Sequence, residues 1–130
     1  MATQLFFDIN TSNGVPVYEQ VAMQIVSAIA SGGLEAGQMV PSGREMAKEL
    51  AINPNTVSRA YRQLQDHAIL ETVRGSGVAV ASGAKAKCKS MRAQAVRERI
   101  SHMIVDARQS HLTDDEILEM IQTEMRKKHR

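Results

Sequence analysis

Short polar and basic side chains recur at helical spacing in the middle of the chain. Asn55, Arg59 and Arg62 fall close together when successive residues are placed about 100° apart, with Ser58 on their flank. This face holds no acidic side chain before Asp66. Arginine donates paired hydrogen bonds to base edges and phosphates, and asparagine can donate one bond to a base and accept another from it. A polar helix face is often only solvated surface. Whether this one binds nucleic acid therefore depends on the elements that position it.

Two helix starts define those elements. Ser42 and Glu45 have the spacing of a capping box, in which each side chain pairs with the backbone N–H of the other residue. Asn53 suits an N-cap, and Pro54 suits the first helical position, where a missing N–H does no harm. We therefore expect a short helix from Ser42 to about Ala51, a tight turn, and a second helix after Asn53.

A hairpin is expected next, with short strands over residues 69–73 and 78–80. Glycine in the connection permits positive φ, and an arginine adds charge to the tip. Two capped helices followed by such a hairpin form a winged helix-turn-helix, which places one helix in the DNA major groove with the hairpin beside it. The connecting residues are Arg74, Gly75, Ser76 and Gly77.

Another helix is expected upstream, over residues 17–31. It starts after Pro16, has an apolar stripe at helical period and stops at Gly32. Residues 1–16 are expected to form an extended arm packed on the core, and residues 39–40 a short strand. The stripe consists of Tyr18, Val21, Ala22, Ile25, Ala28 and Ile29.

The chain changes character after Ala81. Residues 82–90 are small and basic, which indicates a linker or a frayed helix start, and two helices follow within residues 91–130. Thr113 and Glu116 form a second capping box. Helices this short are marginal alone, so their apolar stripes need another surface. They either fold back on the winged domain or pack against a second chain, and we favour the second chain. The residues expected at that dimer contact are Val96, Ile100, Met103, Ile104, Leu118, Ile121 and Met125.

The fold class expected is mainly α with a small β-hairpin wing: a winged helix-turn-helix plus a two-helix C-terminal dimerisation tail. Residues 1–81 are the arm and DNA-binding domain, residues 82–90 the linker, and residues 91–130 the tail. A two-fold dimer would set two recognition helices about 34 Å apart, one DNA turn.

Composition narrows the function classes. The 130 residues carry a net charge of only +2, so any basic surface must come from segregation of charge. The single cysteine excludes an intramolecular disulfide. No apolar run approaches the roughly 18 residues that a membrane-spanning helix needs, and the N-terminus lacks a signal-peptide pattern. We therefore expect a cytoplasmic protein without membrane association. No catalytic or cofactor-binding motif is present, and the four histidines are scattered. We expect neither an enzyme, nor a metal site, nor a cofactor.

These residues together resemble the DNA-binding domain of the GntR family of bacterial transcription regulators. The resemblance covers about residues 15–81 without a gap, and the short two-helix tail is similar to the YtrA-type branch, which lacks a large effector domain. The matching residues are Pro16, Tyr18, Gln20, Gly32, Leu34, Gly37, Pro41, Ser42, Arg44, Ala47, Thr56, Val57, Ala60, Tyr61, Leu64, Gly75, Ser76 and Gly77.

The resemblance implies a homodimeric repressor that binds a palindromic double-stranded DNA operator. The branch often regulates neighbouring transporter genes. We expect Arg59 and Asn55 to reach base edges, while Ser42, Arg44, Arg62 and the wing hold the backbone. The full set of predicted DNA contacts is Ser42, Arg44, Asn53, Asn55, Thr56, Ser58, Arg59, Arg62, Arg74, Gly75, Ser76 and Gly77.

The sequence also departs from the family pattern. Ala36 stands where proline is frequent, Val40 and Met46 where leucine is frequent, and Ala68 where glycine often precedes the wing. These are apolar or turn positions, so they affect packing details rather than DNA binding.

The main alternative is a winged helix that binds protein or RNA. Specific RNA readers usually stack bases on aromatic side chains, and this chain has only two Phe and two Tyr. Release from DNA would need a ligand that prefers another dimer geometry. No residue set identifies such an effector, although a small one at the dimer interface or beside the winged domain stays open.

Overall fold

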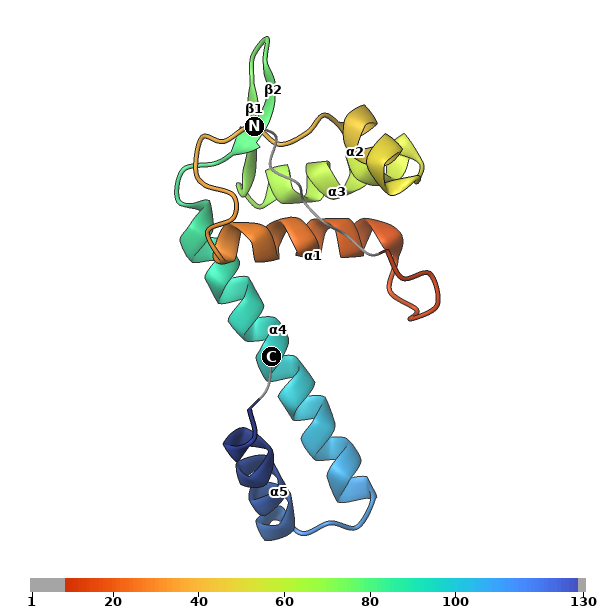
Figure 1. Cartoon of the computed structure of the whole chain (residues 1–130), viewed down its shortest axis with the longest axis vertical. Coiled ribbons are helices and arrows are strands. Elements are labelled where there is room, and N and C mark those ends of the chain that lie inside the picture. Colours follow the sequence, from red (N-terminus) through yellow and green to blue (C-terminus); the bar gives the residue numbers. More distant parts are fainter. Residues whose placement is uncertain (1–8, 129–130) are drawn as a thin grey trace. The chain divides into compact units, whose positions relative to one another are not determined.

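The computed structural model describes residues 9–128, so the residue 1–8 part of the expected N-terminal arm lies outside the described residues. The chain divides into two compact units, a winged unit up to Arg92 and a tail unit from Ala93 onward. Figure 1 shows the order of elements. Their bounds are α1 Val17–Ala30, α2 Gly43–Leu50, α3 Pro54–Asp66, β1 Leu70–Val73, β2 Gly77–Val80, α4 Ala84–Gln109 and α5 Asp114–Arg126. These elements confirm the expected fold class.

The winged unit is built on α3, which packs against both α1 and α2. The stripe predicted for α1 lies inside, with Val21 and Ile25 fully buried. From α3, Val57 and Leu64 enter the same core, and Met46 joins them from α2. Burial of these stripes leaves the opposite face of α3 in solvent, which is how packing selects the side chains that can reach a ligand.

Both predicted helix starts are present in the helix-turn-helix. The capping box at Ser42 is complete: its Oγ accepts from the Glu45 N–H at 3.1 Å, and its own N–H donates to Glu45 Oε1 at 3.2 Å. Asn53 Oδ1 accepts from the Asn55 N–H at 2.8 Å, and Pro54 occupies the first turn of α3. Between the helices, Ala51 closes α2 in the left-handed region with φ 55°.

The wing is an antiparallel hairpin in which Leu70 pairs with Val80 and Val73 with Gly77. A three-residue connection closes it, and the Ser76 N–H donates to the Val73 carbonyl at 2.9 Å. The expected strand at residues 39–40 is reduced to a single bridge between Met39 and Ala79. The bridge still ties the loop before α2 to the wing.

Of the two interpretations of residues 82–90, a linker or a helix start, the structure has the helix start, because α4 is one helix of 26 residues from Ala84 to Gln109. Ala84 and Cys88, four residues apart, are fully buried in the core of the winged unit. Their burial stabilises a segment whose lysines and alanines are themselves good helix formers. The first turns of α4 therefore pack on the core of the winged unit, although their composition is small and basic.

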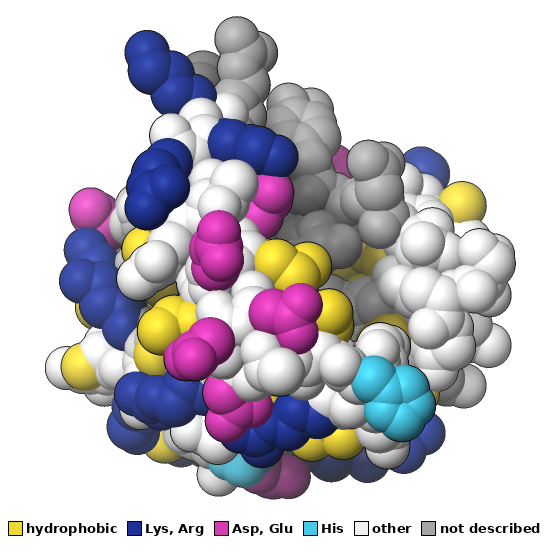
Figure 2. All heavy atoms as spheres, turned by 90° about the horizontal axis from the view of Figure 1, so that it is seen from below, with side chains coloured by type: hydrophobic (Ala, Val, Ile, Leu, Met, Phe, Trp, Pro, Cys, Tyr) yellow, Lys and Arg dark blue, Asp and Glu magenta, His cyan; other side chains and the backbone are white. Residues whose placement is uncertain are grey.

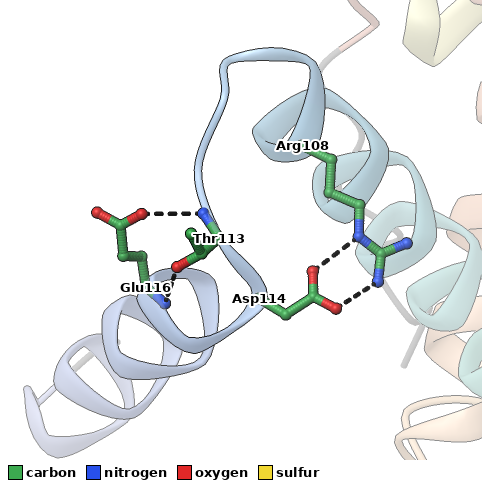
Figure 3. Close-up of polar contacts among 4 residues, drawn as sticks. All are labelled: Arg108, Thr113, Asp114 and Glu116. Atoms are coloured by element: carbon green, nitrogen blue, oxygen red, sulfur yellow. Dashed lines mark hydrogen bonds and ion pairs between the residues drawn. The ribbon is translucent and has the colours of Figure 1, made fainter.

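The tail unit comprises the later part of α4 and all of α5, and Figure 3 shows the turn between them. The second predicted capping box is complete: the Glu116 N–H donates to Thr113 Oγ1 at 3.1 Å, and the Thr113 N–H donates to Glu116 Oε1 at 2.9 Å. The Arg108 guanidinium donates two hydrogen bonds to the Asp114 carboxylate, at 2.9 and 3.1 Å. These local contacts fix where α5 starts, and Ile117 of α5 is buried at a groove that residues of α4 also line.

Candidate nucleic-acid interface

The exposed face of α3 holds the side chains that the sequence singled out. Asn55, Ser58, Arg59 and Arg62 are exposed, and Thr56 is half-buried. They lie opposite the buried stripe of the same helix, so the packing of α3 alone turns them to solvent. This arrangement presents hydrogen-bond donors and positive charge on one surface.

The start of α2 lies against this face. A Cβ added to Gly43 would lie 3.8 Å from Ser58 Oγ, which places Ser42 and Arg44 beside the N-terminal half of α3. Two of the predicted contacts, Ser42 and Asn53, already serve as helix caps. The oxygens accept those cap bonds, so the Ser42 hydroxyl hydrogen and the Asn53 amide hydrogens can still donate to phosphate.

One buried tyrosine fixes α3 to the start of α2. The Tyr61 hydroxyl donates to the Pro41 carbonyl at 2.6 Å. Burial raises the pKa of Tyr61 well above its usual value, and the nearby carboxylates of Glu45 and Glu49 raise it further. The phenol therefore stays protonated and keeps donating at physiological pH.

Arg59 makes a contact that sequence analysis missed. Its guanidinium carbon lies 3.8 Å from the centroid of the Tyr18 ring. Tyr18 stands at the start of α1, 41 positions away along the chain, and its helical spacing indicated only a core role. No local sequence signal could have shown this contact, because it depends on how α1 crosses α3.

The wing tip is the second part of the interface. Arg74, Gly75, Ser76 and Gly77 are all exposed, and Figure 1 shows the hairpin projecting from the three helices. Gly75 has φ 80°, a backbone conformation that favours glycine. The Gln65 amide donates to Thr72 Oγ1 at 3.0 Å, so the end of α3 is linked to the strand that leads to the tip.

The tail unit contains a different surface, an open apolar groove of about 480 Å³ between α4 and α5. Four predicted dimerisation residues line it: Met103, Ile104, Ile121 and Met125. Val96, Ile100 and Leu118 are exposed but lie outside the groove lining. Ala107, Ile117 and Met120, which were not in the predicted contact set, also line it. Figure 2 shows apolar side chains reaching the surface among charged ones.

Other kinds of site find no support in the described part of the chain. Among residues 9–128, no group of three or more His, Cys, Asp or Glu side chains could hold a metal ion. Within the same range, no helix has the length and apolar character needed to cross a membrane. The exposed face of α3, the start of α2 and the wing form the candidate interface.

Comparison with known proteins agrees with this geometry. The family model described as bacterial regulatory proteins, gntR family, matches residues 17–80, the span from α1 through β2. The transcriptional repressor YtrA of Bacillus subtilis is 34% identical over 99 residues, which are 76% of this chain and 76% of YtrA. The chain belongs to the GntR family. Its relatives are transcription regulators, which bind DNA and are not enzymes.

Solved structures extend the likeness beyond the GntR domain. A transcriptional regulator from Oenococcus oeni superposes with a TM-score of 0.76 at 28% identity, covering 92% of this chain and 99% of that one. The DNA-binding domain of AraR, solved in complex with operator ORX1, superposes with a TM-score of 0.51 at 27% identity. That match covers 62% of this chain and 99% of the AraR domain.

The departures from the GntR pattern have structural counterparts. Val40 and Met46 are buried, so both remain apolar core residues. Ala36 is exposed in the turn before the Met39 bridge. Ala68 has φ 56°, in the left-handed region that glycine occupies without strain. The substitution for glycine at residue 68 therefore bears on the stability of the wing connection.

Proposed function

We propose that this GntR regulator is a homodimeric repressor that inserts α3 into the major groove of each half of a palindromic operator. The observation that supports this most directly is the exposed face of α3, where polar and cationic side chains stand opposite a fully buried stripe. Helices presented in this way, with a hairpin alongside, dock in the major groove.

The side chains divide into two roles in this proposal. Arg59 and Asn55 read base edges, because both can donate or exchange paired hydrogen bonds with one base. Ser42, Arg44, Arg62 and the wing tip contact the sugar-phosphate backbone and set the register. Arg44 lies in the first turn of α2, where the free backbone N–H groups and the helix dipole also favour a phosphate.

The second copy is the proposed occupant of the apolar groove in the tail unit. Met103 is 58% exposed and Met125 is 78% exposed, although both line a groove with almost no polar surface. A two-fold contact buries the same groove on both chains, and it doubles the DNA contact area of a small reading module. Regulation of neighbouring transporter genes stays a prediction from the family resemblance, and release by a small effector stays open.

The DNA-reading part can be tested by selecting bound duplexes from a random library with the full chain. A palindromic motif is the expected result. Arg59→Ala should weaken binding by about 1–3 kcal/mol and relax preference at one position in each half-site. Binding curves on the selected duplex and its single-base variants measure both effects. An unchanged preference after this substitution would show that Arg59 does not read bases.

Arg44→Ala is the matched comparison for Arg59→Ala. It should weaken binding to all sequences alike and reduce the slope of log affinity against log salt by about 0.9 for each phosphate that the variant no longer neutralises. A gel shift that compares duplex DNA with single-stranded RNA over several salt concentrations tests the alternative function. A preference for RNA would overturn the proposal.

A further inference from the structure

The contact between Arg59 and Tyr18 joins the centre of the reading face to a different helix. At 3.8 Å from the ring centroid, the guanidinium carbon is within stacking range of the Tyr18 ring face. Among the described residues, no hydrogen bond or ion pair holds the Arg59 side chain, so the ring is its partner. An exposed arginine otherwise samples many rotamers, and ordering it on binding lowers affinity.

The stack leaves the N–H donors of the Arg59 guanidinium free to bind a base. A ring covers one face of the planar guanidinium, while the five N–H groups point outward in its plane. Two of these donors can therefore pair with O6 and N7 of a guanine while the stack persists. Tyr18 can preorganise the fork without competing for the base.

Tyr18 is itself held in place at the start of α1. Its side chain is half-buried and packs against the hydrophobic core, and its hydroxyl donates to Glu19 Oε1 at 3.3 Å. The next residue but one, Gln20, fixes the loop before the helix: its amide donates to the Asn10 carbonyl at 2.6 Å and to the Val15 carbonyl at 3.0 Å. The ring is therefore held mainly by its packing on the core, at the end of a loop that Gln20 ties together.

We propose that Tyr18, outside the helix-turn-helix, is a positioning residue that sets operator specificity by holding the Arg59 guanidinium ready to read a guanine. The inference rests on the proposed base-reading role of Arg59. In this inference, a residue of α1 contributes to the preference for one DNA sequence, in addition to the exposed residues of α3.

The test is a double-mutant cycle with Tyr18→Leu, Arg59→Ala and the double variant, in the full chain. The readout is the ratio of affinities for the selected duplex and for the same duplex with the recognised guanine replaced. Tyr18→Leu should lower this ratio by about 3- to 10-fold. This is the effect expected when one cation–π contact that is exposed or only partly desolvated is lost. The double variant should match Arg59→Ala, because Tyr18 acts only through Arg59.

Tyr18→Phe is the control, since it keeps the aromatic face and removes only the hydroxyl bond to Glu19. Its affinity ratio should equal that of the unsubstituted protein. Thermal unfolding of each variant tests whether it is folded. If Tyr18→Leu does not fold, Tyr18→Met takes its place. A phenylalanine variant that loses discrimination like the leucine variant would overturn the role of stacking.

The remaining outcomes separate the two proposals. If Arg59→Ala lowers the ratio and Tyr18→Leu does not, the positioning role is wrong and the base-reading role stands. If Arg59→Ala leaves the ratio unchanged, the base-reading role fails and the inference fails with it. A Tyr18→Leu variant that binds more tightly, or that weakens every sequence equally in both backgrounds, would also overturn the inference.

Discussion

Single residues in this protein hold α3 in place through contacts that are remote in sequence. The clearest is Tyr61, which is buried on α3 and donates to the Pro41 carbonyl at 2.6 Å, just before α2 starts. This bond links the two helices of the helix-turn-helix at the point where Ser42 and Arg44 emerge. Loss of the hydroxyl removes this hydrogen bond from a part-buried carbonyl.

Tyr61→Phe should therefore lower the free energy of unfolding by about 0.5–1.5 kcal/mol. Denaturant unfolding measures this, with Tyr18→Phe as the control, because the Tyr18 hydroxyl contacts only an exposed carboxylate. Equal losses in the two variants would contradict the anchoring role of Tyr61.

The same residue predicts a dependence of stability on alkaline pH. The pKa of Tyr61 is raised in the folded state by burial first and by Glu45 and Glu49 second. A raised folded pKa means that the stabilisation is complete below the unfolded value near 10 and declines as pH rises toward the folded value. The stability difference between the unsubstituted protein and Tyr61→Phe should therefore shrink above pH 10. A constant difference would show that Tyr61 ionises equally in both states.

Ala68 offers a prediction of opposite sign. Its φ of 56° is strained for alanine, so Ala68→Gly should raise the free energy of unfolding by about 0.5–1 kcal/mol, even after the entropy cost of glycine. Thermal unfolding should show a rise of a few degrees, about 4–8 °C for each kcal/mol. Ala86→Gly, at an exposed position inside α4, is the matched control and should lower the melting temperature.

At the scale of elements, local capping decides where helices start, and the turn before α5 shows this most fully. Thr113 and Glu116 satisfy each other's backbone N–H groups, while Arg108 clasps Asp114 (Figure 3). These contacts lower the pKa of both carboxyls: hydrogen bonds from Thr113 act on Glu116, and the Arg108 hydrogen bond and charge act on Asp114.

A lowered folded pKa means that the stabilisation is present above the unfolded value and is lost as pH falls through the folded value. The helical content of α5 should therefore decline below about pH 4.5, the ordinary value for Glu116. Circular dichroism or residue-resolved NMR across this range measures the loss. Glu116→Gln should flatten the dependence, whereas Glu119→Gln, on an exposed residue outside the capping box, should leave it unchanged.

For the molecule as a whole, the tail unit leaves apolar side chains uncovered, and the proposed second copy covers them. Ile104→Asp places a charge in the groove and should reduce self-association by sedimentation at micromolar concentrations, with a parallel loss of operator affinity. Ser101→Asp is the control, because it adds the same charge at an exposed position of α4 outside the groove lining. An unsubstituted chain that sediments as a monomer at these concentrations would remove the basis for the dimer.

The local order of this chain was predictable from sequence because its signals act over four residues or fewer. Both capping boxes, the Asn53 cap, the apolar stripe of α1 and the glycine-bearing wing connection are of this kind, and each lies where it was expected. The helical spacing of Asn55, Arg59 and Arg62 identified the face of α3 that packing leaves exposed. The residues of this span resemble the GntR family, and the similarity to YtrA of Bacillus subtilis showed that the chain belongs to it.

Tertiary structure alone decided the contacts that join distant residues. Composition left residues 82–90 open between a linker and a helix start, and the burial of Ala84 and Cys88 in the core accompanies the helix. The Tyr61 bond to Pro41 and the Arg59 stack on Tyr18 depend on the packing of α3 against α2 and α1. Periodicity states which face of a helix is buried, but not which side chain meets which across the core, because that depends on crossing geometry and side-chain shape.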